Sequence, residues 1–347
     1  MLRGDLPLAL DARLIERGAR TPCQRLRANV VAGTDPERVL VAAHGEDALQ
    51  VETGRISPFA RAIGVAFERR VMADKAKLIR ELYRRSLAIA EVVDLRHFLD
   101  NREPEKAEEH TIALIEHRVA TGEGPDLVLG ARLPLETSAG TVHIRPDYLV
   151  FRGKAARVGE VKSYLDLDGR TDASEIGTAV RQAAIGVLTI RALFGEGACE
   201  HIVDLVLRSP RRPWATLRPL DGTAEIANIS AFLSSMKKEE QEVEAATNGV
   251  PLLVPGAIEA VPHRFEASCE THCAFFAVCH DEAIAKDELT LLGASAAAAL
   301  EGVGTVARAT ELAQGAPPLT PDEERVAAVL EVAWRASEAI EVQPGTG

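Results

Sequence analysis

Pro146-Asp-Tyr-Leu-Val-Phe-Arg-Gly-Lys-Ala-Ala-Arg-Val-Gly-Glu-Val-Lys162 is the stretch that decides the fold of this chain. Apolar residues lie on both sides of Gly153-Lys154, which predicts two antiparallel strands joined by a two-residue turn. About that turn the numbers of facing residues sum to 307, so Asp147 lies opposite Glu160. Lys162 is two residues beyond Glu160 and therefore projects from the same face of the hairpin.

The facing carboxylates of Asp147 and Glu160 indicate a cation site. Opposed side chains of a hairpin have Cβ atoms roughly 4.5–5.5 Å apart, so both carboxylates can ionise only with a cation between them. Mg²⁺ or Mn²⁺, which prefer oxygen ligands, would satisfy that need. The Lys162 ammonium could then hold a nucleophilic water or stabilise a negatively charged transition state. A solvent-facing hairpin with scattered charges is the alternative.

The rest of the chain predicts an α/β fold in which a mixed sheet is flanked by helices. Helical periodicity is typical of four ranges, 57–90, 105–120, 175–194 and 225–246. Alternating patterns predict strands over 127–135, 142–151 and 157–165, and a further hairpin of 201–207 with 215–219. Another helix is expected to begin at Thr320-Pro321.

Composition indicates an ordinary globular protein. The 347 residues contain no run that approaches the roughly 18 apolar residues of a membrane helix. The first residues lack the apolar core of a secretory signal, so we expect a cytoplasmic location. A net charge of -12 argues weakly against nucleic-acid binding, although six arginines crowd the first 27 residues.

Three of the five cysteines, Cys269, Cys273 and Cys279, lie within eleven residues, and Cys23 is the expected fourth member of a metal site. Soft thiolates select iron–sulfur clusters, zinc or copper(I). Four cysteines can hold a [4Fe-4S] cluster, and the apolar residues 274–278 would shield it from water. Zinc and buried unliganded thiols are the alternatives. Cys199 is the expected odd one out, as a structural or free thiol.

Several motifs together resemble the PD-(D/E)XK nucleases. Pro146-Asp147 and Glu160-Val161-Lys162 resemble the motif itself. Gly64-Val-Ala-Phe-Glu68 resembles the Gly-x-x-Phe-Glu helix of RecB-like members, and Gln182 resembles the glutamine of their Gln-x-x-x-Tyr element. Gly186 stands where that tyrosine is expected. The resemblance implies a restriction-endonuclease-like core with a helical C-terminal appendix.

The cysteines extend this resemblance to the iron–sulfur branch of the group, so that it spans Cys23 to Cys279. That branch includes CRISPR-associated exonucleases and AddB-type nuclease subunits, which also have one early and three late cysteines. Their late cysteines usually follow Cys-x2-Cys-x5-Cys, whereas this chain has Cys-x3-Cys-x5-Cys. The resemblance implies a cluster that clamps the N-terminal segment to the end of the nuclease core.

The resemblance also implies roles for individual side chains. Asp147, Glu160 and the Val161 carbonyl would bind Mg²⁺ or Mn²⁺, and Lys162 would position the attacking water. Gln182 would align the scissile phosphate. The implied catalytic set is Glu68, Asp147, Glu160, Lys162 and Gln182.

The outermost ligand of that set is the least defined by the resemblance. Glu68 would complete or orient the metal shell, but several relatives carry histidine at its position. His110 and His117 are therefore alternative ligands.

The expected organisation has an N-terminal segment, a nuclease core and a helical tail. In the tail, Leu300-Glu-Gly-Val-Gly-Thr-Val-Ala307 resembles the glycine hairpin of helix-hairpin-helix modules, whose backbone N–H groups bind a phosphate. A plain helical hairpin is the alternative. The boundaries are 1–56 for the segment with the first cluster cysteine, 57–285 for the core that ends in the cysteine cluster, and 286–347 for the tail.

Two further sets of side chains suit nucleic acid. Arg208-Ser-Pro-Arg-Arg-Pro-Trp214 places three arginines and an indole at a hairpin tip, where they could meet phosphates and stacked bases, although such a tip can simply be solvated. Arg181, beside Gln182, could meet a substrate phosphate. We therefore expect a DNA nuclease that acts on single strands or ends. The expected protein partner is a helicase or another repair or defence protein. A non-catalytic DNA-binding or assembly subunit and an RNA-directed nuclease are the alternatives.

Overall fold

Six strands form one mixed sheet, in the order β1-β2-β5-β6-β7-β8. The computed structural model describes residues 2–4, 7–46, 48, 58–265, 269 and 273–341. β1 pairs parallel with β2 and β6 with β7, and the other neighbours are antiparallel, as expected for a mixed α/β fold. The strands of this sheet are β1 (Val92–Asp94), β2 (Leu127–Leu129), β5 (Tyr148–Arg152), β6 (Ala155–Leu165), β7 (Ile202–Arg208) and β8 (Ala215–Asp221).

The central hairpin has the predicted register. Tyr148 of β5 faces Gly159 of β6, and Arg152 faces Ala155 across a turn at Gly153-Lys154. Every facing pair sums to 307, as the sequence predicts. The predicted hairpin of 201–207 with 215–219 is likewise confirmed by the antiparallel pairing of β7 with β8.

Two predicted strands are each split in the structure. The strand predicted over 127–135 is interrupted at Gly130, which has φ +68° and lies so close to Arg96 that a Cβ would meet its backbone N at 2.7 Å. The strand predicted over 142–151 is interrupted at Pro146, which has no N–H to donate to a ladder. The outer pieces, β3 (Leu133–Thr137) and β4 (Gly140–Ile144), form a separate two-stranded sheet.

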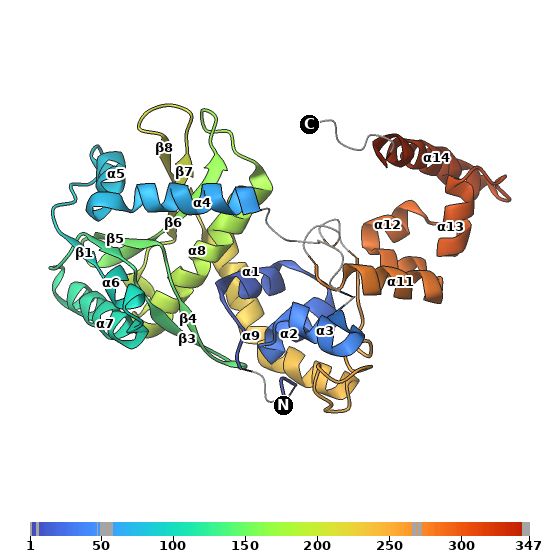
Figure 1. The fold of residues 1–347 in the computed structure, drawn as a ribbon, viewed down its shortest axis with the longest axis horizontal. Helices are drawn as coiled ribbons and strands as arrows, with labels where there is room; N and C mark the ends of the chain where they lie inside the picture. Colours follow the sequence, from blue (N-terminus) through green and yellow to red (C-terminus); the bar gives the residue numbers. More distant parts are fainter. Residues whose placement is uncertain are drawn as a thin grey trace.

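Helices cover both faces of the large sheet (Figure 1). On one face, α4 (Pro58–Val71) and α5 (Ala73–Tyr83) pack Phe67 and Ile79 against Tyr148 and Val161. On the other face, α8 (Ala173–Phe194) packs its buried residues against the alternate side chains of β5, β6 and β7. The sheet is therefore buried between two helical layers.

The helix predicted over 57–90 is two helices, and residue 57 lies outside the described residues. Met72 separates α4 from α5, and Asp74, Lys75 and Ala76 have positive φ values, which no continuous helix adopts. The chain then ends α5 at Tyr83 and enters β1, a short strand that the periodicity does not predict.

Other predicted helices are confirmed within a few residues. α7 spans Pro104–Thr121 and α9 spans Thr223–Ala246, and α6 (Arg96–Asp100) precedes α7. Among the described residues, α8 is the one helix long and apolar enough to cross a membrane, with a mean hydropathy of 1.2 over its best window. Half of that window is buried inside this fold.

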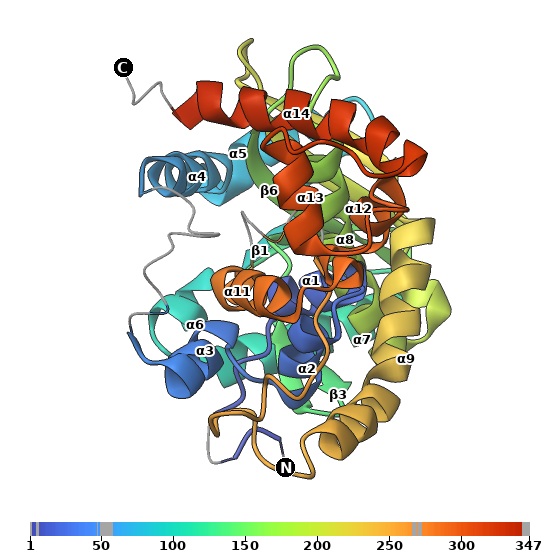
Figure 2. The same ribbon diagram turned by 90° about the vertical axis from the view of Figure 1, so that its right-hand side faces the viewer.

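Three N-terminal helices that the periodicity does not predict pack beside the sheet domain. They are α1 (Ala12–Arg20), α2 (Gln24–Ala32) and α3 (Pro36–His44). α1 contacts α8 and α9, and α2 contacts α9, so this segment shares the core of the α8 layer. Figure 2 shows α9 running beside α1 and α2.

The C-terminal helices form a small core of their own, at the right of Figure 1. Leu300, Val303, Leu312 and Val326 are buried in it. The last helix begins after Thr320, as predicted. The elements of this part are α11 (Phe276–Lys286), η3 (Leu289–Leu292), α12 (Ala294–Ala299), α13 (Val306–Ala313) and α14 (Pro321–Glu341).

Candidate functional site

Asp147 and Glu160 meet at the point where the chain enters β5. The preceding strand, β4, ends at Ile144, and Pro146 lies between it and β5. The Asp147 carboxylate accepts a hydrogen bond from the Val161 N–H at 2.6 Å. Burial, and then the charge of Glu160, raise the pKa of Asp147 well above its ordinary value. The pair therefore favours either a shared proton or a bound cation.

Lys162 joins the carboxylate pair to α8. Its Nζ lies 2.7 Å from Glu160 Oε1 and donates to Gln182 Oε1, also at 2.7 Å. Burial lowers the pKa of Lys162, but the negative charges of Glu160 and Asp147 outweigh it and raise that pKa above the ordinary value. Lys162 is therefore an ammonium and a donor, and not a base, around neutral pH.

Glu68 does not form a three-carboxylate group with Asp147 and Glu160 in the described structure. Its side chain is exposed on α4, and its charge is the smallest of the main causes that shift the pKa of Asp147. Across the described part of the chain, no three His, Cys, Asp or Glu side chains gather closely enough to hold a metal ion. Mg²⁺ keeps several waters and commonly binds through one or two carboxylates, so Asp147 and Glu160 still fit it.

The structure gives the alternative histidine ligands other neighbours. His110 Nδ1 lies 2.8 Å from the Lys106 carbonyl, and its ring packs on Phe98 with centroids 4.8 Å apart. His117 lies farther along α7, beside Gly124. These contacts are to α6, α7 and the loop that follows, and not to the carboxylate pair.

The missing tyrosine has a packing explanation. A Cβ added at Gly186 would lie 3.3 Å from Val158 and 3.4 Å from Pro146, so α8 approaches the hairpin too closely for a large side chain. Gln182 is one helical turn earlier. The same close approach therefore carries the Gln182 amide to Lys162.

A buried hydroxyl cluster holds the hairpin from the opposite face. The Tyr148 ring covers Gly159, where an added Cβ would lie 2.0 Å from it. Tyr83 donates to Asp204 at 2.5 Å, and its hydroxyl lies 3.4 Å from that of Tyr148. Glycine is therefore required at 159 by close packing. None of the sequence motifs singles out this cluster.

Arg181 has a structural partner in place of the predicted phosphate. Its Nε donates to Glu16 Oε1 at 2.7 Å, and Glu16 is 2% exposed on α1. The pair ties the N-terminal helices to α8, one residue before Gln182. Arg181 is thus a positioning residue, and its predicted contact with substrate is not favoured.

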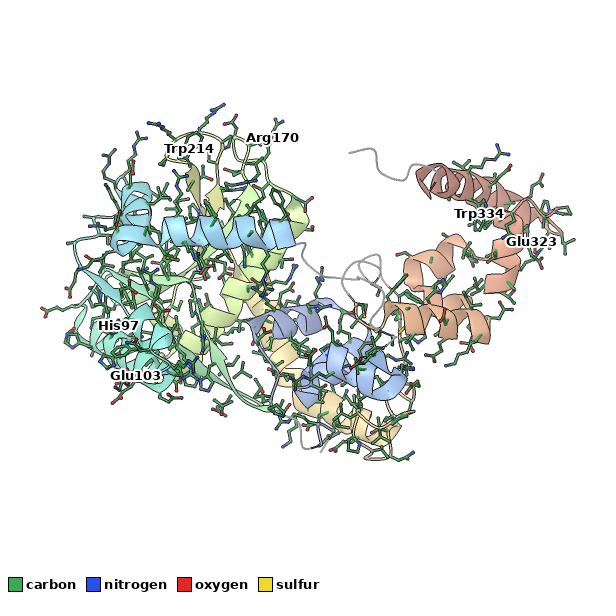
Figure 3. The ribbon with its side chains drawn as sticks, in the orientation of Figure 1. His97, Glu103, Arg170, Trp214, Glu323 and Trp334 are labelled. Atoms are coloured by element: carbon green, nitrogen blue, oxygen red, sulfur yellow. The ribbon has the colours of Figure 1, made fainter. Side chains whose placement is uncertain are left out.

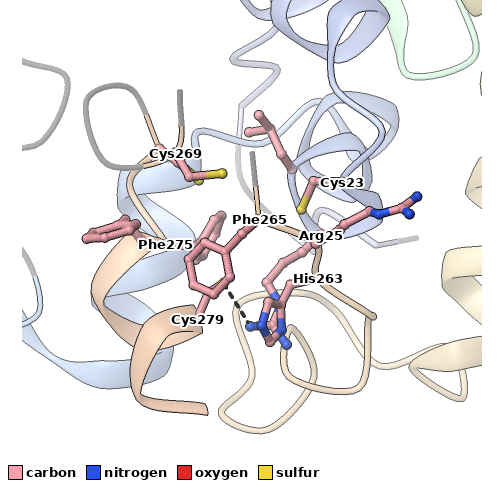
Figure 4. Close-up of a pocket in the computed structure, with 11 residues that line it drawn as sticks. Cys23, Arg25, His263, Phe265, Cys269, Phe275 and Cys279 are labelled. Atoms are coloured by element: carbon pink, nitrogen blue, oxygen red, sulfur yellow. Dashed lines mark hydrogen bonds between the residues drawn. The ribbon is translucent and has the colours of Figure 1, made fainter. Parts of the chain in front are cut away.

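The four cysteines of the proposed cluster line one pocket (Figure 4). Cys23 is the N-cap residue of α2 and Cys279 lies on α11, so the pocket joins the N-terminal and C-terminal helices. All five cysteines are described, and none forms a disulfide. A hydrogen bond with Cys269 and burial raise the pKa of Cys273, and burial raises that of Cys279 to about 12.

These soft donors fit a thiophilic centre. Buried thiols with raised pKa values resist ionisation unless a metal replaces the proton. The sulfurs line the pocket without forming a closed coordination shell. Cys199 is buried elsewhere, where it bridges Ala156 of β6, in keeping with its expected separate role.

Arg25 is a component of the cysteine pocket that the motifs do not single out. It is 1% exposed, and its Nη1 donates to Cys279 Sγ at 3.2 Å and lies 2.8 Å from Glu282. Its Nε donates to the Val261 carbonyl at 3.1 Å. A buried cation of this kind offsets the negative charge of nearby thiolates. Its position in an arginine-rich segment was the one signal in the sequence.

The glycine turn of the tail has its helix start already occupied. Gly302 and Gly304 both have positive φ, as a Gly-x-Gly turn predicts. The Ala307 N–H donates to Asp287 Oδ1 at 2.7 Å, and Thr305 caps the helix at the next N–H. The protein's own oxygens thus take the groups that would bind a phosphate, which favours the plain helical hairpin.

Replacing Asp147 with asparagine is expected to stabilise the metal-free protein. Asparagine keeps an acceptor for Val161 but removes the charge that Glu160 repels. Because the folded-state pKa of Asp147 is raised, its stabilising contribution is complete below the unfolded pKa of about 3.9 and is lost as the pH rises through the folded pKa. Thermal melts in EDTA should show that the melting temperature of Asp147→Asn exceeds that of wild type by a margin that grows with pH. The margin should be roughly 2–4 °C per kcal/mol of relieved repulsion.

Asp172→Asn is a control of opposite sign. Asp172 caps α8, and hydrogen bonds from Ser174 and Glu175 lower its pKa. Its contribution is present above the unfolded pKa and is lost as the pH falls, so this variant should not gain stability at neutral pH. An Asp147→Asn protein that melts below wild type at every pH would contradict the repulsion.

Comparison with protein-family models and with curated proteins gives no match to this chain.

Proposed function

We propose that this protein is a metal-dependent phosphodiesterase that hydrolyses DNA, on single strands or ends, with a restriction-endonuclease-like core. The observation that carries the proposal is the half-buried Asp147–Glu160 pair, with the Lys162 ammonium 2.7 Å from Glu160. A like-charge pair beside a fixed cation is costly without a ligand, and such arrangements concentrate at functional sites. The pair supports a cation site, and the neighbouring ammonium supports phosphate chemistry.

The roles follow from the donors and acceptors of each side chain. Asp147, Glu160 and the Val161 carbonyl would hold Mg²⁺ or Mn²⁺, with Glu68 in an outer position. The ion, when bound, would polarise the phosphodiester and lower the pKa of the attacking water. Lys162 would hold that water or stabilise the developing negative charge.

Gln182 has a double role in this proposal. Its carbonyl oxygen accepts from Lys162, which fixes the direction of the ammonium. Its amide N–H groups remain able to donate to a phosphate oxygen, because a glutamine side chain carries separate donor and acceptor atoms. Gln182 would thus align the ammonium and the scissile phosphate together.

We also propose a structural [4Fe-4S] cluster bound by Cys23, Cys269, Cys273 and Cys279. The support is the chemistry of the donor set, four thiols that line one pocket beside a buried guanidinium. Such a cluster would tie α2 to α11 and so join the two ends of the chain.

A cleavage assay tests the nuclease proposal. Single-stranded DNA labelled at either end is incubated with protein and Mn²⁺ or Mg²⁺, beside duplex DNA and RNA of the same sequence. We expect metal-dependent cleavage of single-stranded DNA that EDTA abolishes. Preferred cleavage of RNA would reassign the substrate, and binding without any cleavage would support a non-catalytic subunit.

A further inference from the structure

The loop between β7 and β8 presents cations and an indole to solvent. Arg211 and Arg212 are exposed, and Trp214 is 39% exposed. Trp214 has φ +73°, a left-handed conformation that is costly for a bulky residue. Its N–H donates to the Arg211 carbonyl at 2.6 Å, and its carbonyl accepts from the Ser209 N–H at 3.0 Å. The loop therefore holds this backbone in place with a large aromatic side chain half in water.

A second loop, 166–171, is fixed beside the first. The Asp166 N–H donates to the Arg208 carbonyl at 2.8 Å, and Arg211 Nη1 lies 2.9 Å from Asp168. Figure 3 labels Arg170 and Trp214 on these two neighbouring loops, which project from the same end of the sheet. The two loops thus make one surface.

This surface is cationic and apolar in a chain that is acidic overall. Arg170, Arg211 and Arg212 are exposed there and outnumber the exposed carboxylate beside them, Asp168, which pairs with Arg211. The chain as a whole carries a net charge of -12. Leu165 is 40% exposed and Leu167 is 51% exposed, so apolar carbon lies among the guanidinium groups. Exposed apolar and aromatic surface among cations suits a polyanion that has flat apolar faces of its own.

The surface adjoins the proposed catalytic residues. Leu165 lies three positions beyond Lys162 on β6, about 10 Å along the strand. Leu165 pairs with Arg208, which in turn pairs with Ala215, the residue after Trp214. A short single strand could therefore reach from this surface to the Asp147–Glu160 pair.

We propose that this surface is a stacking platform for single-stranded nucleic acid, with bases on Trp214 and phosphates on the arginines. Unpaired bases expose the faces of their rings to a protein, whereas the bases of a duplex are stacked on one another. The arginines would neutralise the phosphates of the backbone. The proposal rests on the phosphodiesterase function and narrows its substrate to unpaired strands. The platform consists of Leu165, Leu167, Arg170, Arg211, Arg212 and Trp214.

Binding measured in EDTA tests the platform apart from cleavage. Trp214→Ala is expected to bind a thymidine oligonucleotide roughly 5- to 150-fold more weakly than wild type, whereas Trp214→Phe keeps most of the affinity. An abasic strand of the same length, which has phosphates but no bases, should bind both variants as it binds wild type. Unchanged affinity of Trp214→Ala for the thymidine strand, or an equal loss on the abasic strand, would overturn the stacking.

Tryptophan fluorescence provides a second measurement that leaves Trp214 in place and so does not depend on the folding of Trp214→Ala. The chain has two tryptophans, so Trp334→Phe leaves Trp214 as the sole indole. We expect the thymidine strand to quench this fluorescence and the abasic strand to leave it nearly unchanged. Bound thymidine strand without quenching would overturn the proposal even if Trp214→Ala fails to fold.

The arginines supply a matched electrostatic test. Arg212→Gln is expected to weaken the binding of thymidine and abasic strands equally. It should also reduce the steepness of the plot of log affinity against log salt concentration by about 0.7. Hydrolysis of a small activated phosphodiester, which cannot span the platform, should be the same in Trp214→Ala and wild type. If wild type does not hydrolyse this small substrate, the phosphodiesterase proposal alone is refuted. If Trp214→Ala binds the thymidine strand as tightly as wild type does, the platform proposal alone is refuted.

Discussion

Glu160→Gln is expected to abolish nearly all metal-dependent cleavage, with a loss of about 10³-fold or more. Glutamine preserves the size and the hairpin position of the side chain but removes the charge that faces Asp147. A metal-held transition state is stabilised by several kcal/mol, and each ~1.4 kcal/mol corresponds to tenfold in rate. Cleavage rates at saturating Mn²⁺ measure the effect.

The same variant should fail to respond to the metal in thermal melts. Wild-type protein is expected to melt at a higher temperature when Mg²⁺ is added, because ligands that bind the folded state alone stabilise it. Glu160→Gln should show little of this shift. Equal cleavage by wild type and Glu160→Gln would mean that the activity comes from another site or another protein.

Lys162→Met is expected to reduce the rate about 10²–10³-fold while leaving metal binding largely intact. Methionine keeps an unbranched side chain of similar reach but cannot donate to Glu160 or Gln182. Lys154→Met is the matched control, because Lys154 lies in the turn of the same hairpin and bonds to the Ala120 carbonyl. The control should retain wild-type activity.

The double variant tests whether the two residues act together. If Glu160 and Lys162 form one catalytic unit, Glu160→Gln with Lys162→Met should be little slower than Glu160→Gln alone. Multiplied losses would instead mean that Lys162 contributes independently of the carboxylate pair.

Cys273→Ser is expected to lose the cluster and much of the stability of the protein. Cys273 is buried in the pocket between the N-terminal helices and α11. Removing one of four thiolates should reduce iron, sulfide and visible absorbance to near background. Structural metals contribute up to about 10–16 kcal/mol of apparent folding free energy in small metal domains, so a large fall in melting temperature should follow.

Cys199→Ser is the matched control for that substitution. Cys199 is as buried as Cys273 but bridges β6 away from the pocket. The Cys199→Ser protein should retain wild-type iron content and visible absorbance. A Cys273→Ser protein that kept its colour and melting temperature would refute the cluster, and stoichiometric zinc without iron in wild type would replace it with a zinc site.

The hairpin is predicted well because its strands, turn and register all depend on residues that are close together in the sequence. Alternating apolar residues fix the two faces, and Gly153-Lys154 fixes the turn, so the register that places Asp147 opposite Glu160 follows. Helices with long periodic stretches, such as α7 and α9, are predicted for the same reason. Strand ends are less well predicted, as at Gly130, where packing against Arg96 ends β2.

Partners that are distant in the sequence could not be predicted from periodicity. Gln182 reaches Lys162 from another element, and Glu16 holds Arg181 across 165 positions. Nothing in a local pattern distinguishes an arginine that meets a phosphate from one that meets a buried glutamate. The reassignment of Arg181 therefore required the packing of α1 on α8.

The sequence by itself determined the α/β class, the central hairpin and the pairing of Asp147 with Glu160, because these depend on neighbours along one or two strands. The tertiary structure decided which groups surround that pair and the cysteines. It brought Arg25 to Cys279 from 254 positions away and kept Glu68 at the margin of the carboxylate pair. Such contacts depend on how whole helices pack, and packing is a property of the complete core rather than of any one segment.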